Sequence, residues 1–236
     1  MTAREAVPLR MIATLALAGF CSGIAVVGVY LLTKPRIDRN RAEALQAAIF
    51  RVLEGASTRT PFALRGDEIV RIEAAGDVLP EDEVVYGGYD EAGALVGFAI
   101  PAEGGGFQDT IKLLYGYDPA RHRIVGMQVL ESRETPGLGD KILKDAAFLE
   151  SFRDLAVEPQ VKLAKGARAR PNEVDAISGA TISSRAVVRI INRANERWLD
   201  PLSGANAAAG PAQTAAGPAR TAVGPARTAA AEGRAE

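Results

Sequence analysis

Residues 94–131 read ALVGFAIPAEGGGFQDTIKLLYGYDPARHRIVGMQVLE. Three apolar runs, rich in β-branched and aromatic residues, are separated by turn-forming residues, and this pattern is typical of neighbouring strands. We expect strands at Ala94–Pro101, Thr110–Tyr117 and Arg123–Glu131, with a turn at Asp118–His122. Because the connections are short, these strands should pair antiparallel.

Working outward, the flanking sequence predicts further strands at Glu68–Ala74 and Val84–Tyr89, with a turn at Glu91–Gly93 before the quoted stretch. Apolar periodicity and breaker residues predict three helices, at Arg41–Leu53, Ala146–Leu155 and Thr181–Leu199. Strands in a row with helices on either side indicate an α+β fold. We expect a mainly antiparallel sheet domain with flanking helices over residues 40–200.

The N-terminal region is different in kind. After a flank of residues 1–10, the segment from Met11 to Thr33 holds 23 residues without a charge. As a helix it would be about 35 Å long, enough to cross a bilayer core. A cleaved signal peptide is the alternative, but its apolar region is usually only about 7–15 residues long. We therefore expect a retained transmembrane helix over residues 11–33.

The C-terminal region is low in complexity. Residues 201–236 contain 14 Ala and repeat a seven-residue unit that begins with Gly-Pro at Gly210, Gly217 and Gly224. Gly-Pro breaks helices, and large aliphatic residues are scarce, so the segment cannot bury enough surface to offset its ordering entropy. We predict a disordered tail.

Overall composition excludes several function classes. Lys and Arg number 28 against 29 Asp and Glu, so the net charge of −1 argues against a nucleic-acid partner. One Cys and one His exclude an intrachain disulfide, a Cys/His zinc site and an iron–sulfur cluster, and we expect no metal site. Any redox chemistry therefore requires an organic cofactor.

Charge is unevenly distributed within the central domain. Residues 67–103 hold ten acids and one base, whereas residues 162–197 hold eight bases and three acids. On the last predicted helix four arginines recur every four residues, at Arg185, Arg189, Arg193 and Arg197. This stripe is either a solvated helix face or a docking face for a partner or an anionic lipid surface.

Two short stretches have the composition of a binding site. The first is Ser178-Gly-Ala-Thr-Ile-Ser-Ser184, where an irregular segment gives way to the last helix. Ser178 is the expected N-cap, which places Thr181 at the third helical position. A helix start with three hydroxyls can bind phosphate, although a well-capped helix alone also explains it.

The second stretch is Glu134-Thr-Pro-Gly-Leu-Gly139, directly after a predicted strand. Pro136 fixes φ, while Gly137 and Gly139 allow positive φ and let backbone amides approach a flat ring. Taken alone, such a loop is more often a structural turn.

Together, the two stretches resemble a known family. Asp175-Ala-Ile-Ser-Gly-Ala-Thr-Ile-Ser-Ser184, with Glu134–Gly139 about 40 residues earlier, is similar to the FMN-binding domain of ion-translocating electron transport complexes. The longer string Arg133–Ile142 most closely resembles the G subunit of the Rnf complex. The C subunit of the sodium-translocating NADH:quinone reductase shares both motifs and remains an alternative.

The resemblance implies a flavoprotein in which FMN is bound covalently through its phosphate to Thr181. It also implies a separate flavin transferase, which takes the group from FAD with Mg²⁺ and reads the motif around that threonine, namely Asp175, Ser178, Gly179, Ala180 and Ser184. The resemblance also implies that the loop Glu134–Gly139 lies against the flavin. Glu134 and Thr135 would bond the flavin through their side chains, and Leu138 would pack on its ring. Gly137 and Gly139 would lie beside them.

In function, the resemblance implies an electron relay in a membrane complex that couples electron transfer between ferredoxin and NAD(H) to ion translocation. The chain would not be catalytic alone. Its partners would be integral membrane and iron–sulfur subunits, the flavin transferase and membrane lipid. A membrane-anchored assembly or binding protein without a redox role is the alternative. A hydrolase using Ser178 is disfavoured because G-x-S-x-G is absent and His122 lies in a turn.

The resemblance further implies a periplasmic flavin domain on a single span in the bacterial inner membrane. The charges around the span favour the opposite orientation, since two arginines precede it whereas Lys34, Arg36, Arg39 and Arg41 follow it. The positive-inside rule is weakest for long domains, so we expect the periplasmic side.

Overall fold

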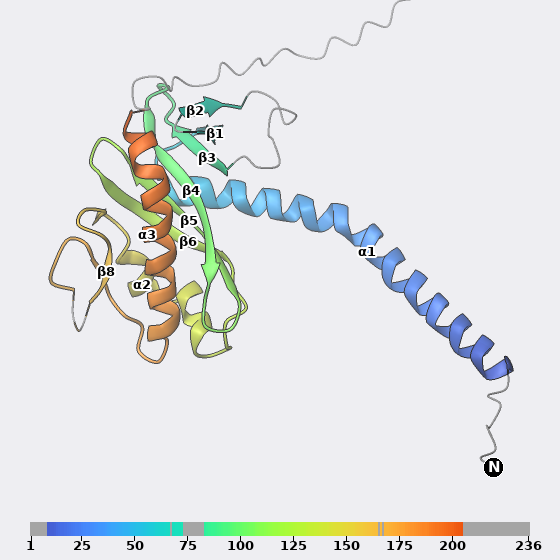
Figure 1. Ribbon diagram of the computed structural model, residues 1–236. Helices are drawn as coiled ribbons and strands as arrows, with labels where there is room; N and C mark the ends of the chain where they lie inside the picture. The colour runs from blue at the N-terminus through green and yellow to red at the C-terminus, as the bar shows by residue number, and fades with distance from the viewer. Residues whose placement is uncertain (1–8, 67, 73–82, 165, 167, 205–236) are drawn as a thin grey trace, which may run out of the picture.

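The computed structural model describes residues 9–66, 68–72, 83–164, 166 and 168–204. Its centre is a seven-stranded antiparallel sheet in the order β2-β1-β3-β4-β5-β6-β7 (Figure 1). The strands are β1 (Thr58–Arg65), β2 (Glu68–Arg71), β3 (Glu83–Tyr89), β4 (Leu95–Gly105), β5 (Thr110–Asp118), β6 (Arg123–Glu131) and β7 (Leu155–Ala156). The sheet and its helices confirm the predicted α+β class.

Strands β3 to β6 follow the sequence pattern closely, and β6 has the predicted bounds. Strand β4 runs four residues beyond its predicted end at Pro101, because Ala102 to Gly105 continue to pair with β5 as far as Gly105↔Thr110. Since β3 begins only at Glu83, the ends of β4 and β5 project past it as a two-stranded arm (Figure 1).

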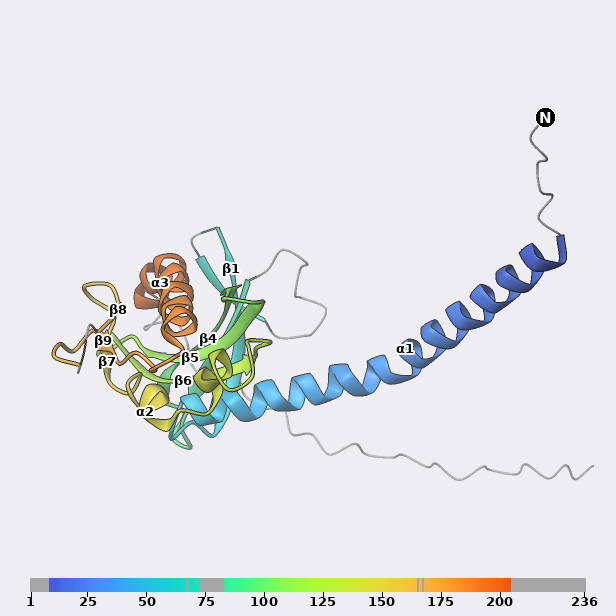
Figure 2. The same ribbon diagram turned by 90° about the horizontal axis from the view of Figure 1, so that it is seen from below.

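Two helices cover opposite faces of the sheet. The end of α1 (Leu9–Val52) lies on one face, and α3 (Thr181–Gly204) lies on the other (Figure 2). Strand alternation supplies both cores, because Ala99 packs with Ile49 and Val52 of α1, whereas Phe98 and Ile100 belong to the larger core beneath α3.

Helix α1 joins two segments that the sequence predicts as separate. It continues through Pro35, so the apolar run and the predicted helix Arg41–Leu53 form one helix of 44 residues. Proline removes one helical hydrogen bond and can bend a helix without ending it. Among the described helices, α1 is long and apolar enough to span a membrane, and its apolar window is exposed throughout.

The predicted helix Ala146–Leu155 is wrong in its second half. Helix α2 covers only Ala146–Glu150, capped by the Asp145 side chain, which accepts a hydrogen bond from the amide of Phe148 at 2.9 Å. Asp154 then adopts a φ of +53°, which ends any helical continuation, and Leu155 pairs with Ile124 as part of β7.

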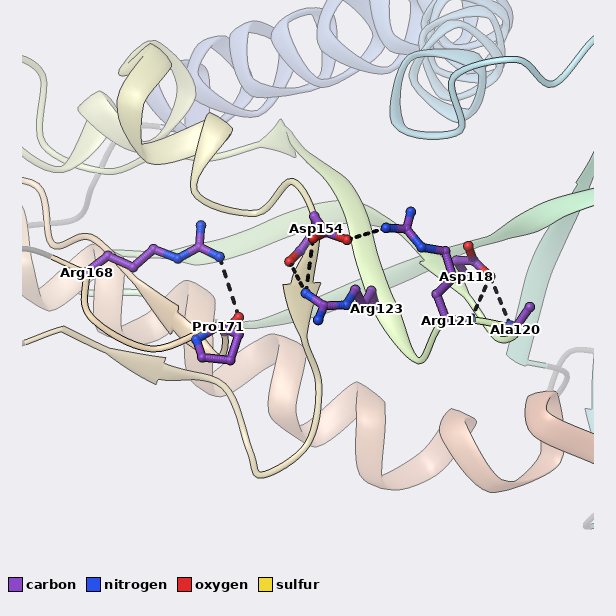
Figure 3. A network of polar contacts seen from close by, with 7 residues as sticks. All are labelled: Asp118, Ala120, Arg121, Arg123, Asp154, Arg168 and Pro171. Atoms are coloured by element: carbon purple, nitrogen blue, oxygen red, sulfur yellow. Dashed lines mark hydrogen bonds and ion pairs between the residues drawn. The ribbon is translucent and has the colours of Figure 1, made fainter.

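Polar contacts fix β7 against the turn between β5 and β6 (Figure 3). Arg121 and Arg123 both pair with the Asp154 carboxylate, at 2.8 and 3.1 Å, and Arg123 also donates to the Asp154 carbonyl oxygen. Asp118 accepts from the amides of Ala120 and Arg121, which confirms the predicted turn.

Three further differences concern strands that the sequence pattern does not fully predict. Strand β1 is missing from the prediction because it contains Pro61, which lacks the amide hydrogen that a strand residue normally donates. Proline is tolerated at this position because the register with β2 begins only at the next residue, with Phe62 opposite Arg71. The short parallel pair of β8 (Lys162–Leu163) and β9 (Glu173–Val174) is also missing from it. The predicted strand Glu68–Ala74 is seen only as β2, which ends at Arg71. Ile72 lies outside the strand, and Glu73 and Ala74 lie outside the described residues.

Helix α3 extends five residues past its predicted end at Leu199, through Pro201, because Leu202 is fully buried in the core. The first four residues of the predicted tail, 201–204, are therefore helical, and residues 205–236 lie outside the described part of the chain.

The arginine stripe on α3 is partly engaged within the molecule. Arg189 donates to the carbonyl oxygen of Gly105 at 2.7 Å, and Arg197 pairs with Glu83 at 3.3 Å. These two side chains fasten α3 to the arm of β4 and to the start of β3. They therefore serve packing between elements as well as solvation.

Candidate functional site

The first turn of α3 lies at the same end of the domain as the tip of the β4–β5 arm (Figure 1). The first helical hydrogen bond runs from the amide of Ser184 to the carbonyl of Ala180 at 2.9 Å, so Ala180 is the N-cap and Thr181 the first helical residue. The prediction of Ser178 as N-cap is wrong. Ser178 belongs to a turn instead, closed by the bond from Ala180 to Ile177, in which Gly179 has a φ of +79°.

The start of α3 leaves the Thr181 hydroxyl accessible at the helix N-terminus. The Thr181 side chain is exposed, and the leading amides of a helix have no partner within the helix itself. Their partial positive charge favours an anion at this end. Ser184, in contrast, is fully buried and donates to the Ala180 carbonyl at 3.0 Å, while it accepts from the Ile177 amide.

The Glu134–Gly139 loop leads from β6 into a short 3-10 helix, Gly139–Leu143. The amides of Leu138 and Asp140 both donate to the Thr135 carbonyl, and the Asp140 carboxylate accepts from the Gly137 amide at 2.7 Å. Gly137 has a φ of +77°, in the region that glycine tolerates. The loop is thus a defined turn, and it holds Leu138 outward with half of its surface exposed.

The Glu134 carboxylate connects three parts of the site. One oxygen, Oε1, accepts from the amides of Phe107 and Gln108 at 2.8 and 3.0 Å, and the other, Oε2, accepts from the Ser183 hydroxyl at 2.6 Å. The side chain is buried. Nearby, the Thr135 hydroxyl donates to the Gln108 side-chain oxygen at 3.0 Å.

Burial alone raises the pKa of Glu134, because it penalises the charged form. The hydrogen bonds from the Ser183 hydroxyl and from the amides of Gln108 and Phe107 outweigh that effect, so the pKa lies below its ordinary value of 4.5. Glu134 is therefore a buried anion at neutral pH.

These elements enclose a pocket of about 360 Å³, within the size range of small-molecule sites. Its lining residues are Phe107, Glu134, Thr135, Leu138, Gly139, Gly179, Ala180, Thr181, Ile182 and Ser183. A larger cavity of about 630 Å³ is lined by residues of α1, β3, β4, β5, β6 and α3, and none of the motif residues lines it.

The rim of the smaller pocket is apolar and exposed. Of the described residues after α1, the large hydrophobic side chains that remain exposed are Phe107, Leu138 and Ile182, at 65%, 51% and 54%. All three line this one pocket, although they come from three different elements. Exposed apolar groups gathered around a cavity mark a surface that something else covers.

The structure brings together most of the residues singled out from the sequence. Seven of them line the pocket: Glu134, Thr135, Leu138, Gly139, Gly179, Ala180 and Thr181. The other four, Gly137, Asp175, Ser178 and Ser184, are outside the lining set. Asp175 accepts from the Arg168 amide at 2.9 Å, and the Ser178 carbonyl accepts from Lys141 Nζ at 3.2 Å.

Sequence reasoning missed Phe107, Ile182 and Ser183 as pocket residues. Phe107 lies 27 residues before Glu134 and reaches the site only because β4 and β5 are long enough to carry their turn there. Ile182 and Ser183 lie within the motif at the start of α3. Ser183 follows Thr181 by two residues, so the helical period could have placed its side chain on the inward face of the helix.

Comparison with known proteins agrees with this geometry. Residues 106–196 match the FMN-binding domain family. The G subunit of the ion-translocating oxidoreductase complex of Methanosarcina acetivorans is 30% identical over 78% of this chain and 91% of its own length. The G subunit of the proton-translocating ferredoxin:NAD(+) oxidoreductase complex of Clostridium ljungdahlii is 24% identical over 75% of this chain and 84% of its own length.

Among solved structures, the crystal structure of Shewanella oneidensis NqrC superposes with a TM-score of 0.57 at 19% identity. The match covers 73% of this chain and all of that one, and at this identity it speaks for the fold alone. The likeness to the Methanosarcina acetivorans G subunit, in contrast, extends over most of both sequences. The chain therefore belongs to the family of G subunits of the ion-translocating, Rnf-type oxidoreductase complexes.

Proposed function

We propose that this chain is a membrane-anchored flavoprotein that carries FMN as a phosphoester of Thr181 and relays electrons within an ion-translocating complex. The observation that carries the proposal is the pocket itself. It has an exposed threonine hydroxyl at a helix N-terminus and an apolar rim formed by Phe107, Leu138 and Ile182.

The residues present fit the two halves of FMN. A flat ring would cover the three exposed apolar side chains, which otherwise remain in contact with water. A phosphate on Thr181 would sit at the positive end of α3, an arrangement that contributes about 0.3–1 kcal/mol near a surface. Lys141 Nζ, held at the Ser178 carbonyl, adds a positive charge next to the same turn.

Attachment requires a transferase, and the chemistry balances with FAD as donor. A phosphorus–oxygen bond forms between Thr181 Oγ and the FMN phosphate, the pyrophosphate bond of FAD breaks, and AMP leaves. The hydroxyl proton passes to a base of the transferase. Three motif residues do not line the pocket, namely Asp175, Ser178 and Ser184. They lie within or next to the segment that such an enzyme would read, and Asp175 and Ser184 accept hydrogen bonds from backbone amides.

When bound, the flavin supplies the redox chemistry, and the protein supplies position and electrostatic environment. The relatives are named as subunits of ion-translocating oxidoreductase complexes, one of them a ferredoxin:NAD(+) oxidoreductase. By this likeness, the partners would be the integral membrane and iron–sulfur subunits of such a complex. The apolar window of α1 is the proposed membrane anchor.

The test is in-gel flavin fluorescence of the full chain, expressed with its flavin transferase and fully denatured. We expect fluorescence at the position of the wild-type protein and none for Thr181→Ala. A Ser203→Ala variant, which removes an exposed hydroxyl at the far end of the same helix, serves as the folded comparison and should keep the fluorescence. Fluorescence that persists in Thr181→Ala, or that is absent from the wild type, contradicts the proposal.

A further inference from the structure

We infer that Glu134 is a positioning residue, whose buried carboxylate holds the β4–β5 tip, the 134–139 loop and the first turn of α3 in one arrangement. We further infer that it presents a fixed negative charge to the pocket. Only this second part rests on the proposed flavin. The assignment replaces the direct side-chain bond to the flavin that the family resemblance implies for this residue.

The contacts of the carboxylate carry the first part. A carboxylate accepts about four hydrogen bonds, and Glu134 already accepts from two backbone amides of the arm and from the Ser183 hydroxyl. The bonded residues of the arm and of α3 lie up to 27 and 49 residues away in sequence from this one side chain. Both oxygens of the Glu134 carboxylate are therefore hydrogen-bonded within the protein, one to the arm and the other to α3.

Two glycines leave the space that the carboxylate occupies. A Cβ at Gly139 would lie 2.7 Å from Glu134 Oε2 and 2.8 Å from Ser183 Oγ. A Cβ at Gly106, beside the tip of the arm, would overlap Glu134 Oε1 and would also lie 2.8 Å from the Asp109 carbonyl oxygen. These distances are shorter than real Cβ contacts, so a side chain at Gly139 would displace the carboxylate or the Ser183 hydroxyl. Glycine at these two positions therefore leaves room for the carboxylate.

The same geometry fixes the rim. Phe107 is held by the bond from its own amide, Ile182 precedes the bonded Ser183, and Leu138 precedes Gly139. Each rim side chain is therefore within one residue of a contact to Glu134. Without the carboxylate, the β4–β5 tip, the 134–139 loop and the first turn of α3 would no longer be held together. The pocket between these three segments would then widen.

The charge acts separately from the bonds. Glu134 lines the pocket, so its negative charge lies beside whatever the pocket holds. A fixed anion disfavours the addition of electrons to a neighbouring group, because charge of the same sign then accumulates in a poorly screened place. Replacement by the neutral isostere glutamine should therefore make the bound flavin easier to reduce.

The first measurement is amide hydrogen exchange in the full-length Thr181→Ala protein, which carries no flavin at that position. We expect Glu134→Ala, which removes the carboxylate, to lower the protection of the Phe107 and Gln108 amides in this background at least tenfold. Gly139→Ala, whose Cβ would have atoms of Glu134 and Ser183 as its nearest neighbours, should also lower it. Ser183→Ala removes only the bond to the other oxygen, so it should change these two amides less than threefold.

The second measurement is the reduction potential of the flavin in the loaded, full-length protein. We expect Glu134→Gln to shift the two-electron reduction equilibrium at least tenfold toward the reduced form, about 30 mV. Ser183→Ala keeps the charge and should shift it less than threefold. The matched control is Glu103→Gln, which removes an exposed carboxylate of β4 that pairs with Lys112.

Each outcome decides one part. Unchanged protection of both amides in Glu134→Ala and Gly139→Ala overturns the positioning role. A potential that moves no more in Glu134→Gln than in Glu103→Gln overturns the charge role. If Glu134→Ala does not fold, Gly139→Ala still decides the first part. A wild-type protein without flavin refutes the proposed function, while the exchange measurement remains valid.

Discussion

At the residue scale, Glu134 gives the domain a pH-dependent stability. Its pKa is lowered in the folded state, so its contribution is complete above the ordinary value of 4.5 and is lost as the pH falls through the folded value. We expect wild type to exceed Glu134→Gln in unfolding free energy by about 1–3 kcal/mol at pH 7. Denaturant titrations should show this difference shrinking below pH 4.5. A difference independent of pH would contradict this account.

Lys141 is the second residue with a testable role. Its ammonium group donates to the Ser178 carbonyl and would meet a Gly179 Cβ at 3.7 Å, so it borders the turn before Thr181. We expect Lys141→Met to slow covalent flavin incorporation about tenfold. A loss of about 1.4 kcal/mol of attraction for the phosphate corresponds to a factor of this size. The control is Lys144→Met, which removes a lysine paired with Asp140. Equal loading rates in the two variants would argue against the role.

Residues of the site could be predicted where they lie within a short motif. Thr181, Glu134 and Leu138 all line the pocket, because the two motifs are themselves the walls. Phe107 could not be predicted, since its place depends on the length of β4 and β5. The bonding of Glu134 to Ser183 also depends on how distant segments pack, and no local spacing encodes it.

At the element scale, the end of α1 lies unusually close to the sheet. A Cβ at Gly116 of β5 would lie 2.6 Å from the carbonyl oxygen of Val52, which is backbone and cannot turn aside. We expect Gly116→Ala to lower the unfolding free energy by about 1–3 kcal/mol, the cost of overpacking. Gly105→Ala, where a Cβ meets nothing within 4 Å, is the control. Equal stability of the two variants in urea would contradict the close packing.

Elements with local signals could be predicted well, and those decided by distant contacts could not. Alternation and turn residues suffice for β3 to β6, including the turn at Asp118–His122. The continuation of α3 through Pro201 depends on burial of Leu202 against the core. The early end of α2 depends on Leu155 being drawn into the sheet beside Ile124.

At the scale of the whole molecule, α1 runs from the proposed membrane anchor to the sheet domain without a loop. From Thr33, where the uncharged run ends, to Val52 on the sheet is about 28 Å of helix. Pro35 is the point where this helix can bend. The continuous helix therefore limits how far the domain can lie from the proposed membrane span.

We propose that the domain lies on the periplasmic side, and a reporter fusion tests this. A reporter enzyme that is active only outside the cytoplasm, fused after Gly204, should be active in intact cells. A reporter active only in the cytoplasm, fused at the same position, should be silent. The reverse pattern would instead agree with the four positive charges that follow the uncharged run, Lys34, Arg36, Arg39 and Arg41.

The attachment of FMN to Thr181 can be measured by peptide mass spectrometry of the matured, full-length protein. We expect the peptide containing Thr181 to gain the mass of FMN less one water, and fragmentation to assign this mass to Thr181. An unmodified Thr181 peptide from protein made with an active transferase, or the same mass on Ser178, Ser183 or Ser184, would contradict it.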